Sequence, residues 1–456
     1  MIADLKPYPK YKESGLAWLG QVPEHWELRP AFGAFAPNHE RNRGMKEKTV
    51  LSLSYGRIII KPPEKLHGLV PESFETYQII NPGDIILRTT DLQNDHTSLR
   101  VGMVRNRGII TSAYLALRMM NDVNQDFGFQ YLNVWDTSKA IYGYGSGLRQ
   151  NLDFSHFKRM PVALPPPEEQ ATIVRFLGWT NGRLERAIKA KRKLIILLNE
   201  QKQAIIHRAV TRGLDLSVAL KSSGIPWIGE IPVHWEVRRL KSFVSNVNDQ
   251  TTTMLDDDVY IALENVQSWT GYVEPQRRQD ETLFLGQVKK FRENDVLFGK
   301  LRPYLAKVVT ASSAGVCVGE FFVLRTNAAI AVPLFLEQLL RSKTIVNVIN
   351  SSTFGAKMPR ADWHFVGALQ VALPPILEQK DIVDSIRMNT QPLNITITRL
   401  EREIELLREY RTRLVSDVVT GKLDVREAAS HLHDESIQDT AEASDDIEST
   451  EEEIAV

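Results

Sequence analysis

The segment from Lys12 to Arg29, KESGLAWLGQVPEHWELR, returns from Lys221 to Arg238 as KSSGIPWIGEIPVHWEVR. The two copies agree at 10 of 18 positions, and they are 209 residues apart. An internal repeat of this length indicates duplication, so one architecture is expected twice.

The same offset occurs in two later pairs of segments. VALPPPEEQATIV, residues 162–174, matches VALPPILEQKDIV, residues 371–383, at 9 of 13 positions. VTRGLD, residues 210–215, matches VTGKLD, residues 419–424. One duplication accounts for all three pairs.

Between these matched frames lie two inserts, residues 30–161 and 239–370, which are equally long but share little evident identity. Each insert alternates short apolar runs with Gly and Asn breaks, a pattern typical of strands, and has a helical stretch near its end. We therefore expect two α+β domains that keep their assembly surfaces and differ in what they recognise. Drift after duplication would give the same divergence.

After each LPP, the apolar residues alternate at spacings of four and three, as in a coiled coil. We expect the two seams to be buried against each other, antiparallel under a pseudo-two-fold relation, unless each helix packs only on its own domain. The seam positions are Leu177, Asn181, Leu184, Ile188, Lys191, Ile195, Leu198, Lys202, Ile205 and Ala209 in the first helix, and Ile386, Thr390, Leu393, Ile397, Leu400, Ile404, Leu407, Arg411, Leu414 and Val418 in the second.

Two residues are expected to kink or break these helices, namely Gly182 and Pro392. About 29 uninterrupted residues would remain in each helix, which is about 43 Å, or roughly 12 to 13 base pairs of duplex. Lys202 and Arg411 occupy equivalent seam slots, and we expect them to reach out from a frayed end of the coil.

Composition narrows the class of protein. The chain has 456 residues, 43% hydrophobic and 25% charged, which is enough for two or three cores. Its single cysteine, Cys317, excludes a disulfide scaffold and a thiolate metal cluster, and an inert role is expected for it. With no long apolar segment and no signal-like start, the expected location is the cytoplasm.

Charge is unevenly distributed along the chain. Residues 427–456 contain 11 acidic residues and no Lys or Arg, so the first 426 residues hold 56 basic against 45 acidic side chains, a net of +11. A basic body favours a polyanionic partner. The tail is expected to be a disordered, solvated terminus, with shielding of the body from nonspecific nucleic acid as the alternative.

The doubled SGxxWxGxxPxHW frame, the doubled LPPxxEQ helix start and the endings AVTRGLD and VVTGKLD resemble the specificity subunit of type I DNA restriction–modification systems. The resemblance covers nearly all of residues 12–424. It implies a non-catalytic DNA reader in which each of two target recognition domains reads one half of an interrupted sequence.

The resemblance also implies the domain organisation and the partners. The expected parts are a first recognition domain with its frame (1–165), a first spacer helix (166–212), a second recognition domain (213–374), a second spacer helix (375–424) and a tail (425–456). The helices would set the gap between half-sites and dock two methylation subunits, with restriction (translocase and nuclease) subunits joining through these. S-adenosylmethionine, ATP and Mg²⁺ are expected in the partners, and no cofactor or metal in this chain.

The absence of common catalytic motifs from the sequence agrees with a non-catalytic role. The chain has no dinucleotide fingerprint, no P-loop and no adenine-methylase tetrapeptide. Asp362 with Glu378 and Lys380 imitates a metal-dependent nuclease, but its repeat mate, Glu169-Gln170-Ala171, lacks the lysine. His25 and His234 have no second metal ligand at a useful spacing. The alternatives are a self-sufficient modification or cleavage enzyme and a doubled DNA- or RNA-binding regulator without enzymatic partners.

Candidate DNA-binding residues form two clusters in each insert, because Arg and Asn can chelate base edges and Gly-rich loops can approach phosphates. Each residue taken alone could equally be a surface or packing group. In the first insert the candidates are Arg88, Thr89, Thr90, Asn94, Arg100, Tyr142, Tyr144, Ser146 and Arg149. In the second insert they are Lys300, Arg302, Tyr304, Lys307, Thr353, Lys357 and Arg360.

Overall fold

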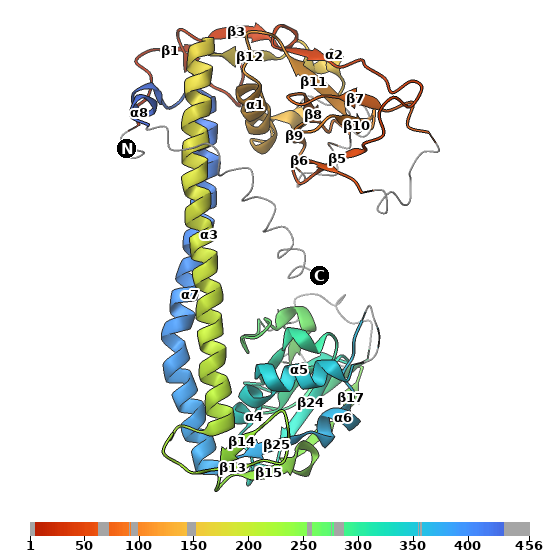
Figure 1. Ribbon diagram of the computed structural model, residues 1–456, viewed down its shortest axis with the longest axis vertical. Helices are drawn as coiled ribbons and strands as arrows, with labels where there is room; N and C mark the ends of the chain where they lie inside the picture. The colour runs from red at the N-terminus through yellow and green to blue at the C-terminus, as the bar shows by residue number, and fades with distance from the viewer. Residues whose placement is uncertain are drawn as a thin grey trace. The chain divides into compact units, whose positions relative to one another are not determined.

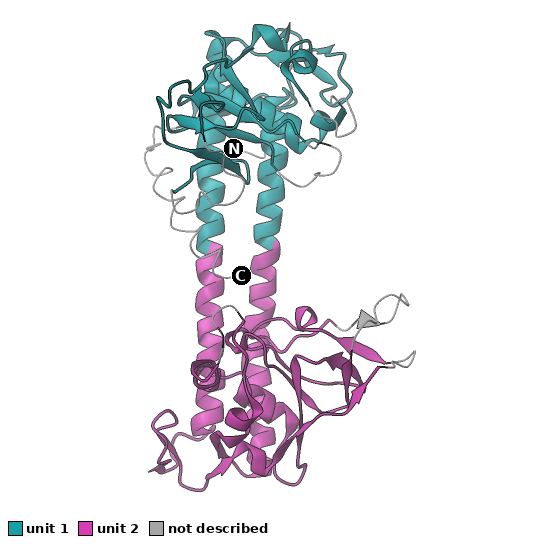
Figure 2. Cartoon of the chain, turned by 90° about the vertical axis from the view of Figure 1, so that its right-hand side faces the viewer, with its two compact units in different colours: residues 1–190, 403–456 teal, residues 191–402 magenta. Residues whose placement is uncertain are grey.

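The computed structural model describes residues 5–62, 73–90, 92, 99–143, 152–252, 258–274, 287–353, 355 and 358–432, and the backbone of 276–277. The chain forms two compact units (Figure 2). Unit 1 comprises residues 1–190 and 403–456, and unit 2 comprises residues 191–402. Each unit contains one part of each of the two long helices.

Unit 1 is built on a four-stranded antiparallel sheet in the order β4 (Phe35–Pro37), β11 (Leu115–Met119), β8 (Ile85–Leu87), β9 (Val101–Met103). Four strand pairs surround it: β1 (Tyr11–Glu13) with β2 (Gln21–Pro23), β3 (Glu27–Pro30) with β12 (Pro161–Leu164), β5 (Leu51–Ser54) with β6 (Arg57–Ile60), and β7 (Gln78–Ile80) with β10 (Gly108–Ile110). The shorter helices are α1 (Gln125–Thr137), α2 (Phe154–Phe157) and α8 (Arg426–Ser430) (Figure 1).

Unit 2 contains an antiparallel sheet in the order β16 (Val244–Val247), β24 (Phe321–Thr326), β21 (Val296–Gly299), β22 (Val308–Thr310). A second, five-stranded sheet has the order β17 (Gln250–Thr251), β20 (Val288–Phe291), β23 (Gly315–Val318), β18 (Val259–Ile261), β19 (Gln276–Arg277). The remaining elements are the pairs β13 (Leu220–Ser222) with β14 (Glu230–Pro232) and β15 (Glu236–Arg239) with β25 (Gln370–Leu373), and the helices α4 (Pro333–Leu340), α5 (Lys343–Ser351) and α6 (Trp363–Ala368).

The two four-stranded sheets are equivalent although the inserts have diverged in sequence. Arg118 of β11 lies opposite Ala36, and Arg325 of β24 lies opposite Ser245, which is 209 residues beyond Ala36. Arg118 and Arg325 each donate through Nε to a buried aspartate, Asp84 at 3.1 Å and Asp295 at 2.8 Å. The inserts therefore keep one core and differ around it.

The long helices are α3 (Pro167–Arg212, 46 residues) and α7 (Ile376–Val419, 44 residues). The expected breaks at Gly182 and Pro392 are wrong, because both residues lie inside continuous helix. Proline removes one backbone bond to the carbonyl four residues earlier. That carbonyl belongs to Met388, whose side chain is 70% exposed, and Pro392 is itself exposed, so water can satisfy the group.

The predicted seam is confirmed by burial, since none of its twenty positions is exposed. In unit 1, Arg411 of α7 pairs with Glu185 of α3 at 3.1 Å. In unit 2, the Nζ of Lys202 donates to Oδ1 of Asn394 at 2.8 Å. In unit 1 the late part of α7 thus lies beside the early part of α3, and in unit 2 the late part of α3 lies beside the early part of α7. The two helices form an antiparallel pair in each unit.

These contacts correct the expectation of a frayed end. Lys202 is only 6% exposed and its ammonium is bonded across the helix pair, so it does not reach into solvent. Burial, and then the nearby Arg341, lower the pKa of Lys202. Arg411 is half-buried and ion-paired instead of free. Within the described residues, no helix is long and apolar enough to span a membrane.

Candidate nucleic-acid interface

The repeated Trp of each frame is anchored by the repeated Glu of a long helix. The indole Nε1 of Trp26 donates to Oε1 of Glu169 at 2.9 Å, and His25 Nε2 lies 2.8 Å from Oε2 of the same carboxylate. The corresponding distances from Glu378 are 3.0 Å to Trp235 and 2.8 Å to His234. Both indoles are fully buried. The His-Trp pair therefore packs the frame onto a helix start.

The adjacent glutamine fastens the recognition insert to the same helix start. Gln170 accepts the N–H of Asn124, directly before α1, at 2.7 Å, and donates to the carbonyl of Pro165 at 2.9 Å. Gln379 accepts the N–H of Val332, directly before α4, at 2.8 Å, and donates to Pro374 at 2.9 Å. The doubled EQ thus joins frame, insert and long helix in each unit.

These contacts also explain the nuclease-like pattern. Glu378 is bonded to Trp235, and the carboxylate of Asp362 caps α6 by accepting the N–H of His364. Among the described residues, no cluster of three or more His, Cys, Asp or Glu is arranged to hold a metal ion. The sequence shows both repeated motifs but not that the Glu of one bonds to the His-Trp pair of the other. The occurrence of both motifs in both halves is the signal from which this pairing could be inferred.

The glycine that follows each long helix packs against the repeated tryptophan of its unit. Gly421, just after α7, has φ +76°, and a Cβ there would lie 3.1 Å from Trp26. Gly213, just after α3, has φ +73°, and a Cβ there would lie 3.3 Å from Trp235. The start of one helix and the end of the other therefore meet at the tryptophan of each unit.

Unit 1 has an additional clasp at this point. The hydroxyl of Tyr8 donates to Oε1 of Glu169 at 2.7 Å, and the guanidinium of Arg426 lies 5.1 Å from the centroid of the Tyr8 ring. Burial, followed by the bond to Glu169, raises the pKa of Tyr8 well above its usual value. The residue 209 positions later is Ser217, so unit 2 has no equivalent tyrosine.

In unit 1, the exit of β8 brings several predicted residues together. Arg88 and Thr90 are half-exposed, whereas Thr89 is 5% exposed. The carbonyl of Thr89 accepts the N–H of Leu152 at 2.9 Å, which brings the end of the insert beside this strand exit. Arg88 and Thr90 thus lie partly at the surface of this strand exit, while Thr89 is largely enclosed.

Arg100 requires a correction as a DNA-contacting residue. It is fully buried, and its guanidinium donates to the carbonyls of Thr90 at 2.8 Å and Arg88 at 3.3 Å and to the Tyr142 hydroxyl at 3.3 Å. The side chain therefore holds the strand exit and the half-exposed Tyr142 in place, and it is too enclosed here to reach a base edge. Asn94, Tyr144, Ser146 and Arg149 lie outside the described residues.

In unit 2, the two predicted clusters form one surface. The N–H of Arg302 donates to the carbonyl of Pro359 at 2.8 Å, and the N–H of Ala361 donates to that of Lys300 at 2.8 Å. Arg302 has φ +50°, a conformation that is costly for a side-chain-bearing residue and is retained where surrounding contacts enforce it. This turn presents Tyr304, 37% exposed, beside half-exposed Lys300 and Arg302.

The remaining candidates of unit 2 are engaged in contacts of their own. Lys307 donates through Nζ to the carbonyl of Leu263 at 2.8 Å, and burial lowers its pKa. Arg360 makes two 3.2 Å hydrogen bonds to Glu320. Thr353 donates to the carbonyl of Asn350 at 2.7 Å. Lys357 lies outside the described residues.

The clusters of the two units occupy equivalent places. Leu152 bonds the exit of β8 at Thr89, and Ala361, which is 209 residues later, bonds the exit of β21 at Lys300. The following strand is tied in the same way, with Arg88 N–H to Arg100 O at 2.8 Å and Gly299 N–H to Lys307 O at 2.9 Å. Each unit therefore offers a differently composed polar surface at one position of a common core.

No protein-family model matches the chain. The chain is 23% identical over 239 residues to the type I restriction enzyme EcoDI specificity subunit of Escherichia coli, a match covering 49% of this chain and about half, 53%, of that protein. It is 20% identical over 437 residues to a protein of Methanocaldococcus jannaschii provisionally named the type I restriction enzyme MjaX specificity subunit, covering 91% of this chain and 98% of that protein.

Among solved structures, the chain is similar to one described under the heading of complex assembly and conformational transition of the type I R-M system. The TM-score is 0.61 at 14% identity, and the match covers 88% of this chain and 99% of the solved one. This similarity concerns the fold. The predicted resemblance to specificity subunits and the predicted α+β domains with a long helix pair are thereby confirmed.

Proposed function

We propose that the protein is the non-catalytic, sequence-specific DNA recognition subunit of a type I restriction–modification complex. Each unit reads one half-site of a bipartite target, and the long helices set the gap between the halves. Methylation and restriction subunits supply the chemistry together with S-adenosylmethionine, ATP and Mg²⁺, and the assembly acts in the cytoplasm. The similarity to curated specificity subunits supports this assignment.

One observation carries the proposal: two equivalent cores present two unlike polar surfaces. A protein that reads one symmetric site needs identical reading surfaces, whereas a bipartite asymmetric target needs different ones. Around the exit of β8 the surface contains Arg88, Thr90 and Tyr142, and around the exit of β21 it contains Lys300, Arg302 and Tyr304. Arginine and lysine can bind guanine edges and also phosphates, and threonine can contact base edges.

An exchange of inserts tests the proposal. Residues 30–161 and 239–370 are equally long, and both are bounded by the same frame contacts, so a copy of 239–370 can replace 30–161 in the full chain. The chain is expressed with its methylation partners, and methylated adenines are mapped by single-molecule sequencing. The native chain should mark an interrupted motif with two different halves, and the exchanged chain one in which the second half-site occurs twice.

The reciprocal exchange is the matched control and should duplicate the first half-site. Marks at uninterrupted motifs, or an unchanged motif after exchange of a folded insert, would contradict the assignment. Methylation by the purified chain alone would indicate a self-sufficient enzyme. Failure of any methylase to co-purify, combined with specific DNA binding, would indicate a regulator without enzymatic partners.

A further inference from the structure

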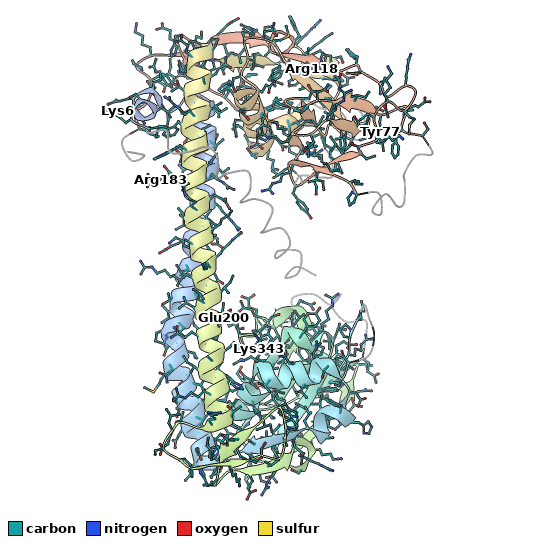
Figure 3. All side chains as sticks on the ribbon, in the orientation of Figure 1. Lys6, Tyr77, Arg118, Arg183, Glu200 and Lys343 are labelled. Carbon is teal, nitrogen blue, oxygen red and sulfur yellow. The ribbon has the colours of Figure 1, made fainter. Side chains whose placement is uncertain are left out.

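The unit 1 part of α3 carries a run of basic side chains on the face opposite the helix seam. Arg175, Arg183, Arg186 and Lys189 lie at spacings of eight, three and three, which at 3.6 residues per turn puts them on one face. The seam residues Leu177, Leu184 and Ile188 fall on the other face and are buried. We call these four cations the α3 stripe. Figure 3 labels Arg183 within it.

Few acidic residues accompany the α3 stripe along α3 itself. Between Glu169 and Glu200 the only acid is Glu185, and its carboxylate is paired with Arg411 at 3.1 Å. Arg175, Arg183 and Arg186 are exposed, and Arg183 also stacks over the Trp179 ring at 4.7 Å. None of the α7 residues 209 positions beyond the four stripe cations is basic; they are Asp384, Pro392, Ile395 and Thr398. The stripe is therefore not a product of the shared frame.

The C-terminal part of the chain is attached at one end of this stripe. Nη2 of Arg175 donates to the carbonyl of Ala429 in α8 at 3.1 Å. Residues 433–456 follow directly and contain ten acidic residues and no Lys or Arg. The stripe from Arg175 to Lys189 is about 21 Å long at the helical rise. Twenty-four residues can extend to about 80 Å, so the segment can follow the whole stripe.

We propose that residues 433–456 bind the α3 stripe of their own chain and keep other polyanions away from it. This segment is opposite in charge to the stripe, is long enough to follow it, and continues from α8, which is bonded to Arg175. An intramolecular acidic segment competes at high effective concentration, so a weak electrostatic contact suffices to occupy the stripe. The proposal goes beyond DNA reading, and its contact is measured without DNA.

Double electron–electron resonance, which measures the distance between two spin labels, tests the contact in the full chain. Ala190→Cys puts one label on the exposed side of α3 next to Lys189, and Ser449→Cys puts the other in the acidic segment. Burial raises the pKa of the native Cys317 thiol to about 12, so this residue remains unlabelled. At low salt we expect a short-distance peak. It should be lost at about 1 M salt, where the screening length falls to about 3 Å.

Charge variants make the test specific to the stripe. Arg183→Glu combined with Arg186→Glu should abolish the short-distance peak at low salt. Arg208→Glu combined with Arg212→Glu reverses two exposed charges of the same helix outside the stripe and should leave the peak intact. The same broad distance distribution at low and high salt, or equal effects of the two pairs, would overturn the proposal.

Neutralising the ten acids with Asn and Gln tests the shielding. Affinity for nonspecific duplex should rise, and the slope of log affinity against log salt should steepen by about 0.9 for each stripe cation that gains a phosphate. An unchanged slope overturns the shielding role. Loss of specific methylation in this variant would instead point to a fault in the proposed DNA recognition, so the two failures are distinguishable.

Discussion

Trp26 Nε1 and Glu169 Oε1 lie 2.9 Å apart, and the same bond joins Trp235 and Glu378 at 3.0 Å. A donor from the frame thus meets an acceptor from a long helix in both halves of the duplication. The environments differ, because the carboxylate side chain is 6% exposed in Glu169 and 26% exposed in Glu378. Equivalent bonds are therefore expected to contribute unequally to stability.

Glu169→Gln should destabilise unit 1 by about 2 to 3 kcal/mol, because a buried charged acceptor of two donors, Trp26 and Tyr8, is replaced by an amide. Glu378→Gln is the matched variant and should cost less, since Glu378 is more solvated and lacks the tyrosine. Urea unfolding of the full chain followed by tryptophan fluorescence measures both costs. Equal costs would contradict the prediction that the lower exposure of Glu169 and its bond to Tyr8 add to the cost.

Lys202→Met should stabilise the helix pair of unit 2 at neutral pH, because the ammonium is buried and its pKa is lowered by burial and by Arg341. The gain is reduced by loss of the bond to Asn394. A stabilisation of about 1 kcal/mol in urea unfolding is expected. Lys193→Met, at an exposed position of the same helix, is the control and should change stability little.

Lys202 should also make the folded protein more stable as the pH rises into the alkaline range. Below the folded-state pKa of Lys202 the full cost of burying its charge is present. As pH rises from that lowered value toward the usual 10.5, the folded state loses its proton before the unfolded state does, and the cost is relieved. Stability attributable to this group should therefore increase through that window. The slope should be smaller in Lys202→Met, and an identical slope would exclude Lys202 as its source.

Asp84→Asn and Asp295→Asn should weaken the two sheets alike, by about 2 kcal/mol each, because each aspartate is buried and bonded to a charged arginine. Each also accepts a turn N–H, from Asn81 at 2.9 Å and from Arg292 at 2.8 Å. Hydrogen exchange of β8 and β21 measures the loss in each sheet separately. A large effect in only one sheet would contradict their equivalence.

The paired helices were predictable from sequence, because an apolar seam with a seven-residue repeat, present in both halves of the duplication, can be recognised from residue spacing alone. The common core of the inserts was not predictable, since Asp84 and Arg118 are separated by 34 residues and their partners in unit 2 sit at shifted offsets. Helix continuity at Pro392 also depends on the exposure of this residue, which the spacing of apolar residues does not determine.

For the candidate interface, clusters were easier to predict than the roles of their members. The convergence of Lys300 and Arg360 on one surface follows from a strand bridge between distant segments. The burial of Arg100 arises because its guanidinium finds three acceptors inside the fold, a fact that composition does not contain. The sequence pattern around an arginine at a strand exit does not distinguish an exposed side chain from a buried one.

Arg302→Ala should weaken DNA binding by about 1 to 3 kcal/mol if the residue contacts a base edge, with relaxed preference at one position of the second half-site. Lys307→Ala is the comparison, because its ammonium is bonded to the carbonyl of Leu263 and should contribute little to base preference. Competition binding with duplexes altered one base pair at a time measures both. A uniform loss over all sequences would assign Arg302 to a phosphate.

Insertion of one heptad into both α3 and α7 should lengthen the gap between half-sites. Seven residues preserve the seam register, so the pair can still bury its apolar positions. Each helix grows by about 10 Å, which corresponds to roughly 3 base pairs of duplex. Insertion of two residues into each helix is the control, because it turns the following seam by about 200°, away from the partner helix, and should destabilise the pair. Methylation mapping reads the gap directly, and a heptad variant with full activity but an unchanged gap would show that the helices do not set the spacing.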